Sequence, residues 1–287
     1  VGRSEVHCKF LCQKGKSHIF ILLFSVSLGN GQNYKKSAKI TYKFLKFACQ
    51  YMERMERDKY VIMMAAGSGS RMGSELPKQF LELNGKAVLQ NTIEVFLSAV
   101  PGIRVIVVLP EDYIEYWKNY CLKRNFSCPQ VLVKGGITRF HSVKNALARV
   151  PDGALVAVHD GVRPLVTEPF LVKMFAEAEK VDALIPVLPC IDTMKVLQEE
   201  DSVLRTVPGA VADRSVLYGA QTPQIFSSEI LKEAYMQPFT PSFTDDASVV
   251  ERYGKSLSYI VGERLNIKIT TQEDLLLARA VCSLRKD

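Results

Sequence analysis

Short apolar runs alternate with amphipathic segments along most of the chain, and this alternation limits what the chain can fold into. The runs are rich in β-branched residues, as in strands that are buried on both faces of a sheet. The segments between them repeat apolar residues every three or four positions, which is typical of crossover helices. We therefore predict a three-layer α/β domain with a mostly parallel sheet. The predicted strands are residues 60–66, 103–110, 130–135, 154–160 and 183–189, and the predicted helices are residues 87–100, 112–125, 138–150 and 168–180.

Basic charge is concentrated in the N-terminal segment. The chain of 287 residues has a net charge of +7. Residues 1–51 contain nine Lys and Arg residues against a single acid, Glu5, whereas the remainder has 28 basic and 29 acidic residues. Charge therefore gives no reason to expect a nucleic acid or a membrane as a partner of the rest of the protein.

We expect residues 1–57 to be a disordered or artefactual extension, because regular hydrophobic periodicity begins only at Lys59. The apolar run at residues 19–26 is too short to cross a bilayer, which takes roughly 20 residues. A targeting signal and an arm that binds a charged surface remain as alternatives. The seven cysteines include no CxxC pair and no zinc-site spacing, which favours reduced thiols and a cytoplasmic protein.

A glycine-rich loop with two cations follows the first predicted strand, in the sequence MMAAGSGSRMGSELPKQF. Its glycines, Gly67, Gly69 and Gly73, allow the backbone to approach a ligand closely and to direct N–H groups at phosphate oxygens. Their spacing matches neither GxxxxGK(S/T) nor GxGxxG, which disfavours the two common nucleotide-binding loops. Arg71 and Lys78 would add positive charge beside a triphosphate. The alternative is a tight strand-to-helix turn without a ligand.

A second charged site is predicted where the strand at residues 154–160 ends, in the sequence VHDGVRP. Ligands in such sheets collect at the carboxyl ends of strands. Asp160 at this end suits Mg²⁺, which takes one or two carboxylates together with phosphate oxygens. The alternatives are a helix N-cap and a salt bridge between Asp160 and Arg163. We interpret His159 as structural, because the chain has only four histidines and no further His/Asp cluster.

Seven motifs occur in the order and at the spacings of one enzyme family. They are AAGSGSRMGSELPKQF, GGITRFHSV, VHDGVRP, DTMK, DRSVLYGAQTPQIF, TDDASVVE and NIKITTQEDL. From about Lys59 to its C-terminus, the chain resembles the 2-C-methyl-D-erythritol 4-phosphate cytidylyltransferases of the non-mevalonate isoprenoid pathway. The resemblance implies transfer of CMP from CTP to methylerythritol phosphate with release of pyrophosphate, and Mg²⁺ or another divalent cation as cofactor. It also implies a twisted sheet of the nucleotide-diphospho-sugar transferase (Rossmann-like) type with a protruding β-arm.

The resemblance further implies roles for individual residues. The catalytic residues it implies are Arg71, Lys78 and Lys268. The implied CTP-binding residues are Ala65, Ala66, Gly67, Ser68, Gly69, Gly135, Gly136 and Ser142. The implied acceptor-binding residues are Asp160, Arg163, Thr193, Arg214, Thr222, Thr244 and Lys268, and Asp160 is also the implied metal ligand.

The segment at about residues 190–214 resembles the family's dimerisation arm, through which Thr193 and Arg214 reach the acceptor phosphate of the neighbouring subunit. The resemblance therefore implies a homodimer with shared active sites, in which residues 58–287 form the cytidylyltransferase domain. Taken singly, Arg214 could instead form a surface salt bridge with Asp213, and Thr244 could cap a helix that starts near Asp245.

Two departures from the family pattern lie at the expected site. Ile137 replaces a frequent acidic residue in the base-binding loop, so a side-chain contact is lost there. Gly161 and Val162 replace a small pair, and the bulkier valine could alter the edge of the pocket. Two other functions stay open: a cytidylyltransferase that acts on ribitol 5-phosphate, and a non-catalytic binding module that uses the basic tail.

Overall fold

The computed structural model describes residues 5–10, 22–27, 57–67 and 76–285. The chain divides into two compact units, Val1–Asp58 and Lys59–Asp287. In the first unit, strands β1 (Glu5–Phe10) and β2 (Leu22–Ser27) form an antiparallel pair that the sequence patterns did not predict. The rest of the expected extension, up to residue 56, lies outside the described residues, so its disorder stays a prediction.

The second unit contains an eight-stranded sheet with the order β12-β9-β13-β8-β3-β6-β7, and β14, outside this order, also pairs with β9. Strands β3, β6, β7 and β8 are mutually parallel, β14 is parallel to β9, and β12 and β13 run antiparallel to their neighbours. The predicted mostly parallel sheet is therefore confirmed. The strands are β3 (Lys59–Met64), β6 (Arg104–Leu109), β7 (Gln130–Lys134), β8 (Leu155–Asp160), β9 (Ala183–Pro189), β12 (Tyr218–Ala220), β13 (Gln224–Ser227) and β14 (Ser258–Val261).

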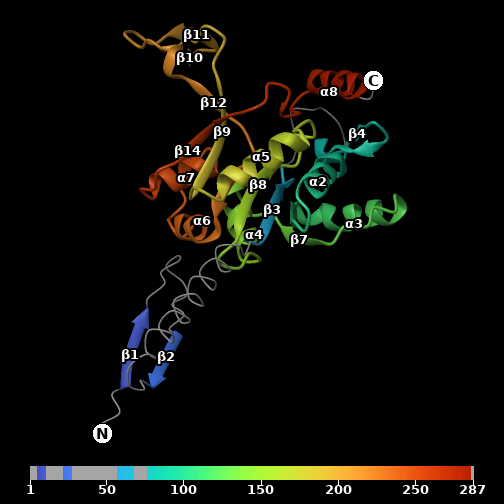
Figure 1. Cartoon of the computed structure of the whole chain (residues 1–287). Coiled ribbons are helices and arrows are strands. Elements are labelled where there is room, and N and C mark those ends of the chain that lie inside the picture. The colour runs from blue at the N-terminus through green and yellow to red at the C-terminus, as the bar shows by residue number, and fades with distance from the viewer. Residues whose placement is uncertain (1–4, 11–21, 28–56, 68–75, 286–287) are drawn as a thin grey trace. The chain divides into compact units, whose positions relative to one another are not determined.

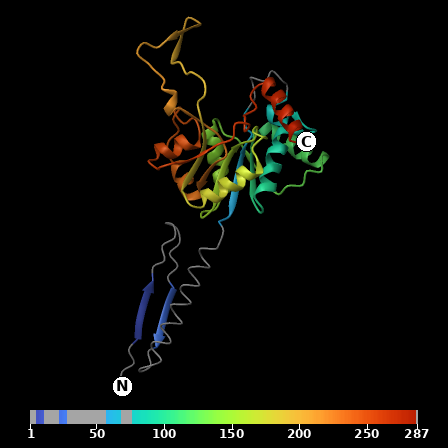
Figure 2. The ribbon, with the colours of Figure 1, turned by 45° about the horizontal axis from the view of Figure 1, so that its top comes forward.

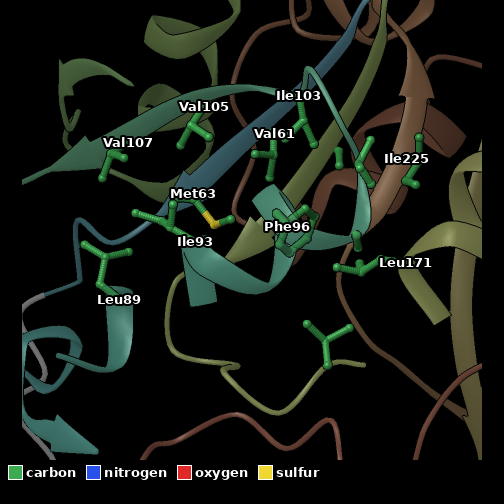
Figure 3. Close-up of a cluster of buried hydrophobic side chains, with 14 of the residues drawn as sticks. Val61, Met63, Leu89, Ile93, Phe96, Ile103, Val105, Val107, Leu171 and Ile225 are labelled. Atoms are coloured by element: carbon green, nitrogen blue, oxygen red, sulfur yellow. The ribbon is translucent and has the colours of Figure 1, made fainter. Parts of the chain in front are cut away.

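Helices cover both faces of this sheet. Successive residues of a strand point to opposite faces, and here they belong to two different apolar clusters. Val61 and Met63 of β3 pack with α2 and α5, whereas Tyr60 and Ile62 of the same strand pack with α4, α6 and α7. Figure 3 shows the first cluster, with Phe96 among side chains from the helices and the strands. The helices are α2 (Val88–Ala99), α3 (Ile114–Lys123), α4 (Arg139–Leu147), α5 (Glu168–Ala178), α6 (Ser228–Ala234), α7 (Asp246–Arg252) and α8 (Gln272–Leu284).

Smaller elements complete the unit. The β10 (Leu197–Glu200) and β11 (Val203–Thr206) hairpin extends away from the sheet and its helices (Figure 1; Figure 2), and all of its residues are exposed. It occupies the place of the predicted arm. Strands β4 (Glu82–Leu83) and β5 (Lys86–Ala87) pair before α2, and the 3₁₀ turns among the described residues of this unit are η2 (Lys78–Phe80), η3 (Glu111–Tyr113) and η4 (Arg214–Val216). Among the described residues, no helix has the length and apolar character that a membrane crossing needs.

Candidate active site

Several of the predicted site residues lie where parallel strands end at one edge of the sheet. Met64, the last residue of β3, pairs with Asp160 at the end of β8. The next residue, Ala65, lies beside Gly161, where an added Cβ would be 3.3 Å from the Ala65 Cβ. Ala66 lies on the side of Gly135, since a Cβ at Gly135 would come within 2.7 Å of the Ala66 Cβ. The start of the glycine-rich loop therefore adjoins both the Asp160 segment and the segment expected to bind cytosine.

Asp160 is the centre of a compact ion cluster. Its Oδ2 accepts a hydrogen bond from Arg163 Nε at 3.0 Å and lies 3.3 Å from Lys268 Nζ. The salt bridge between Asp160 and Arg163 that was open as an alternative is thus present, and the structure adds Lys268 to it. Asp160 is buried, whereas the Lys268 side chain is 43% exposed. Two cations on one carboxylate leave an excess of positive charge, which suits a polyanionic ligand.

The charge state of this cluster follows from its contacts. Burial alone would raise the pKa of the Asp160 carboxyl, but the nearby charges of Lys268 and Arg163 outweigh it and hold the pKa well below its usual range. Asp160 is therefore ionised at neutral pH. A permanent carboxylate between two cations can orient both of them and can also accept a metal ion.

Thr222 and His159 hold the Asp160 main chain in place through a chain of hydrogen bonds. The Asp160 N–H donates to Thr222 Oγ1 at 3.1 Å, and Thr222 Oγ1 lies 3.1 Å from His159 Nδ1. Burial lowers the pKa of His159 to about 3, so its ring is neutral. The Thr222 hydroxyl then donates to Nδ1, and Nε2–H donates to the Arg163 carbonyl at 3.3 Å. This histidine is fully buried, as expected for a structural residue.

Asn266 links the parts of this cluster, and the sequence patterns did not single it out. Its Nδ2 donates to the Thr222 main-chain carbonyl at 2.8 Å, and the Asn266 main-chain carbonyl accepts from Arg163 Nη1 at 2.8 Å. The chain then returns to the Asp160 turn, where the Ile269 N–H donates to the Val162 carbonyl at 2.9 Å. Lys268 is held between these two anchors. The only available signal was its place in the motif NIK, two residues before Lys268.

The expected base-binding segment is held by its own side chains. Ser142 Oγ accepts from the Gly136 N–H at 2.9 Å and donates to the Thr138 carbonyl at 2.9 Å. Ile137, which stands in this segment, is 95% exposed. The segment thus has a defined backbone in which Gly135 and Gly136 leave no room for a Cβ.

Val162, part of the second departure from the family pattern, is buried and packs with Leu165, Ile269 and Leu275 in a separate apolar cluster. Its expected effect on the edge of the pocket stays a prediction. At Gly161 there is little room for a side chain, because an added Cβ would lie 2.9 Å from Leu89 Cδ1.

A buried ion pair joins the start of α4 to the start of α7. Arg139 Nη1 and Nη2 donate to the two carboxylate oxygens of Asp246 at 2.9 and 2.5 Å, and Tyr235 Oη donates to Asp246 Oδ1 at 2.6 Å. Burial disfavours the charge on Arg139, but the Asp246 carboxylate outweighs this effect and raises the pKa of the guanidinium. The residues are 107 positions apart, and sequence reasoning gave neither a role.

The glycine-rich loop is described at its two ends. At one end, the Ala65 N–H donates to the Val108 carbonyl at 3.0 Å, and Gly67 is the last described residue. At the other end, Lys78 is the first residue of η2 and is half-buried. Ser68, Gly69 and Arg71 lie outside the described residues, so their predicted roles stay predictions.

No described contact joins three of the predicted acceptor-binding residues, Thr193, Arg214 and Thr244, to the Asp160 cluster. Thr193 is exposed in the arm, and Arg214 Nη1 donates to the Ile191 carbonyl at 3.0 Å. Within residues 76–285, Arg214 forms no ion pair with Asp213, whose carboxylate instead accepts from the Ser215 N–H at 2.9 Å. Thr244 is exposed and does not cap α7, because Asp245 is the N-cap. Both of the simpler alternatives for these residues are therefore wrong.

A divalent cation fits the donor set around Asp160. Among the described residues, no group of three or more His, Cys, Asp or Glu side chains gathers as a metal site. Both ion contacts of Asp160 fall on Oδ2, so Oδ1 can bind a cation. A single carboxylate is enough for Mg²⁺ when phosphate oxygens and water supply the other ligands.

Comparison with known proteins assigns the chain to a family. The family model for IspD, 2-C-methyl-D-erythritol 4-phosphate cytidylyltransferase, matches residues 60–284. The chain belongs to this family. The enzyme of that name from Bacteroides thetaiotaomicron is 45% identical over 221 residues, which cover 77% of this chain and 98% of the relative. The enzyme from Porphyromonas gingivalis strain W83 is 44% identical over 226 residues, or 78% of this chain and 98% of the relative.

Solved structures agree with this assignment. The crystal structure of 4-diphosphocytidyl-2C-methyl-D-erythritol synthase from Anaerococcus prevotii is 30% identical in sequence and matches with a TM-score of 0.63. The match covers 79% of this chain and 96% of that chain. The α/β nucleotidyltransferase fold implied by the motifs is thus confirmed, and the family is one of cytidylyltransferases.

Proposed function

We propose that this IspD family member transfers CMP from CTP to 2-C-methyl-D-erythritol 4-phosphate, forming 4-diphosphocytidyl-2-C-methyl-D-erythritol and pyrophosphate. The observation that carries the proposal is the position of the Asp160 cluster, with Arg163 and Lys268, directly beside Ala65 at the start of the glycine-rich loop. This arrangement brings an acceptor phosphate and a nucleotide triphosphate to one cationic edge. Ribitol 5-phosphate as acceptor and a non-catalytic binding role are not favoured, because the matched relatives are named for methylerythritol phosphate.

The chemistry needs charge neutralisation more than a general base. A phosphate oxygen of the acceptor, already anionic, attacks the α-phosphorus of CTP, and the bond to the oxygen that bridges to the β-phosphorus breaks. Pyrophosphate leaves with the electron pair of that bond. Two polyanions must approach each other in this step, so fixed positive charges lower the barrier by orienting them and by stabilising the charge that develops.

On the CTP side, we assign the backbone of Ala65 to Gly67, together with Ser68 and Gly69, to the triphosphate. Arg71 and Lys78 stabilise the α-phosphate as it becomes pentacoordinate. Cytosine lies against the segment that begins at Gly135 and Gly136 and is fixed by Ser142. This assignment is supported by the close approach between Gly135 and Ala66, which joins the base site to the phosphate site.

On the acceptor side, Lys268 and Arg163 bind the phosphate and Asp160 binds hydroxyl groups and the cation. Thr222 supports Asp160 through its hydroxyl. We assign a resident Mg²⁺ to Asp160, where it would supply electrostatic stabilisation of the phosphate oxygens.

Kinetic constants of four variants test these roles. Lys78→Ala and Arg71→Ala should lower kcat by a factor on the order of 10², because these groups interact most strongly with the transition state. Lys268→Ala and Arg214→Ala should mainly raise KM for methylerythritol phosphate. Pyrophosphate release measured against each substrate separates the two groups, and equal small effects in all four variants would refute the division.

We further propose a homodimer in which the arm at residues 190–214 carries Thr193 and Arg214 to the partner's acceptor phosphate. Support comes from the apolar side chains that the arm exposes. Among them are Ile191, Leu204 and Val211, which are 61%, 66% and 90% exposed. A second copy of this chain would cover such a surface.

Subunit complementation tests this sharing. Heterodimers of Lys78→Ala and Arg214→Ala chains contain one site with both residues intact. At a methylerythritol phosphate concentration too low for the Arg214→Ala homodimer to turn over, a co-expressed mixture should therefore regain about a quarter of wild-type activity. A mixture of Lys78→Ala and Lys268→Ala chains is the matched control and should stay inactive at the same low concentration, because both residues belong to the same subunit's site. Equal recovery in the two mixtures, or none in the first, would contradict shared sites.

The remaining organisation is also proposed. Residues 58–287 form the catalytic domain, and residues 1–57 are dispensable for catalysis. A cytoplasmic location is supported by the free thiols of Cys121, Cys128, Cys190 and Cys282. Pyrophosphate release by a chain that begins at Asp58 should equal that of the full chain.

A further inference from the structure

Gln79 is a polar side chain in an apolar setting, next to the predicted catalytic Lys78. It is 1% exposed. A buried amide is costly unless it forms hydrogen bonds. Its Nε2 donates to the Ala65 carbonyl at 2.7 Å and lies 3.3 Å from the Gly67 carbonyl. Both described hydrogen bonds of the side chain therefore go to the backbone that opens the glycine-rich loop.

The Ala65 carbonyl needs this partner because the sheet ends one residue earlier. Strand pairing of β3 stops at Met64, which is the last residue in register with Asp160 and with Val108. Beyond it, the Ala65 N–H still donates to the Val108 carbonyl at 3.0 Å. The Gln79 amide then takes the place of the missing strand neighbour for the carbonyl.

The other end of this connection is rigid. Gln79 lies in η2 between Lys78 and Phe80, and the turn is closed by the bond from the Phe80 N–H to the Pro77 carbonyl at 2.9 Å. The Phe80 ring is buried and packs on Tyr116 of α3 with a centroid distance of 4.9 Å. Gln79 therefore links a packed turn to the start of the glycine-rich loop, because Ala65 lies 14 residues before it in the sequence.

We propose that Gln79 is a positioning residue that ties both ends of the glycine-rich loop together, and so fixes Lys78 relative to the triphosphate-binding backbone at Ala65 and Gly67. The inference rests on the proposed CTP-binding role of that backbone. Gln79 does not touch the substrate. It acts by narrowing the range of positions that the two loop ends can adopt before CTP binds, which is the preorganisation that phosphoryl transfer requires.

Two substitutions remove the tie in different ways. Gln79→Met keeps the length of the side chain without its donor, and Gln79→Glu places a carboxylate against two carbonyl oxygens. We expect kcat/KM for CTP to fall roughly 10-fold in the first and on the order of 100-fold in the second, whereas KM for methylerythritol phosphate stays within about 2-fold. A role in folding alone would lower thermal stability without separating the two substrates.

Gln237→Glu is the control matched in its hydrogen bonds. Gln237 Nε2 also donates to two main-chain carbonyls, those of Ala234 and Val249, at 2.9 and 3.0 Å. Because Gln237 is half-buried, this variant should lose stability for the same reason as Gln79→Glu but to a smaller extent, while its kinetic constants stay at the wild-type level. A similar kinetic loss in Gln237→Glu would overturn the proposal.

A double variant gives the most direct result. If Gln79 acts by placing Lys78, then Gln79→Met adds little to the loss already caused by Lys78→Ala, and the two effects are not additive. Full additivity, or Gln79 variants with wild-type kcat/KM for CTP, would overturn the inference. Failure of the proposed function is distinct from either result, because the wild-type chain would then release no pyrophosphate from CTP and methylerythritol phosphate.

Discussion

Asp246→Asn tests the buried ion pair with Arg139, and its cost can be worked from the contacts. The change keeps the shape of the side chain but faces Arg139 Nη2 with an amide in place of a carboxylate oxygen at 2.5 Å. Asp246 is fully buried, and the Arg139 side chain is 29% exposed. Removing one partner of a buried pair costs about 3–5 kcal/mol. Because Arg139 is partly exposed, we expect Asp246→Asn to lower the free energy of unfolding by about 3 kcal/mol, the lower end of this range.

Urea unfolding of the wild type and the variant measures this cost as a change in the free energy of unfolding at constant m. The melting temperature should fall by roughly 6–12 °C for a domain of this size. Glu177→Gln is the control, since it removes an exposed pair with Lys180 at 2.9 Å and should change stability by less than about 0.5 kcal/mol.

A double-mutant cycle then isolates the pair. Arg139→Met leaves a buried carboxylate with only the Tyr235 hydroxyl as a described donor, so it should cost at least as much as Asp246→Asn. The combination Arg139→Met/Asp246→Asn should recover about 2 kcal/mol relative to the sum of the single changes. A loss below about 1 kcal/mol in Asp246→Asn, with no coupling in the cycle, would show that the pair behaves as a surface pair and would refute this reasoning.

Two further predictions concern the neutral histidine and the base site. Burial lowers the pKa of His159 to about 3, so the unfolded chain binds more protons below about pH 6.5. The stability contributed by the neutral ring is complete above that pH and is lost by about 1.4 kcal/mol per pH unit as the pH falls toward 3. Unfolding midpoints of His159→Gln should therefore change less between pH 6 and pH 4 than those of the wild type, and identical slopes would be inconsistent with a buried neutral ring. Gly135→Ala should raise KM for CTP about 10-fold, because its Cβ would lie 2.7 Å from the Ala66 Cβ. The control, Gly219→Ala, should leave KM for CTP unchanged, because a Cβ at Gly219 would have no atom within 4 Å. Equal KM values in the two variants would contradict the proposed base site.

The parallel strands and their crossover helices could be predicted from the sequence because each carries its own periodicity. The strand predicted at residues 103–110, for example, is observed as Arg104–Leu109. The strands β12, β13 and β14 were missed because none has more than four residues, too few for a pattern. Helix α8 had a usable signal in the capping box formed by Thr271 and Asp274, which sequence reasoning did not exploit.

The site residues also differ in whether the sequence could predict them. Asp160 and Lys268 could be found because their motifs are specific, and the structure brings them to 3.3 Å. Gln79 and Asn266 could not be assigned roles, because a glutamine or an asparagine becomes informative only when its burial and its partners are known. The pair of Arg139 and Asp246 joins the starts of α4 and α7 across 107 positions of the sequence, and no local pattern encodes that contact.

Pyrophosphate release by the purified chain with Mg²⁺ tests the central claim most directly. CTP, ATP, GTP and UTP are each combined with methylerythritol phosphate and with ribitol 5-phosphate. We expect release only with CTP and methylerythritol phosphate, and loss of that release in Asp160→Asn. Release with ribitol 5-phosphate in place of methylerythritol phosphate, or full activity in Asp160→Asn, would contradict it.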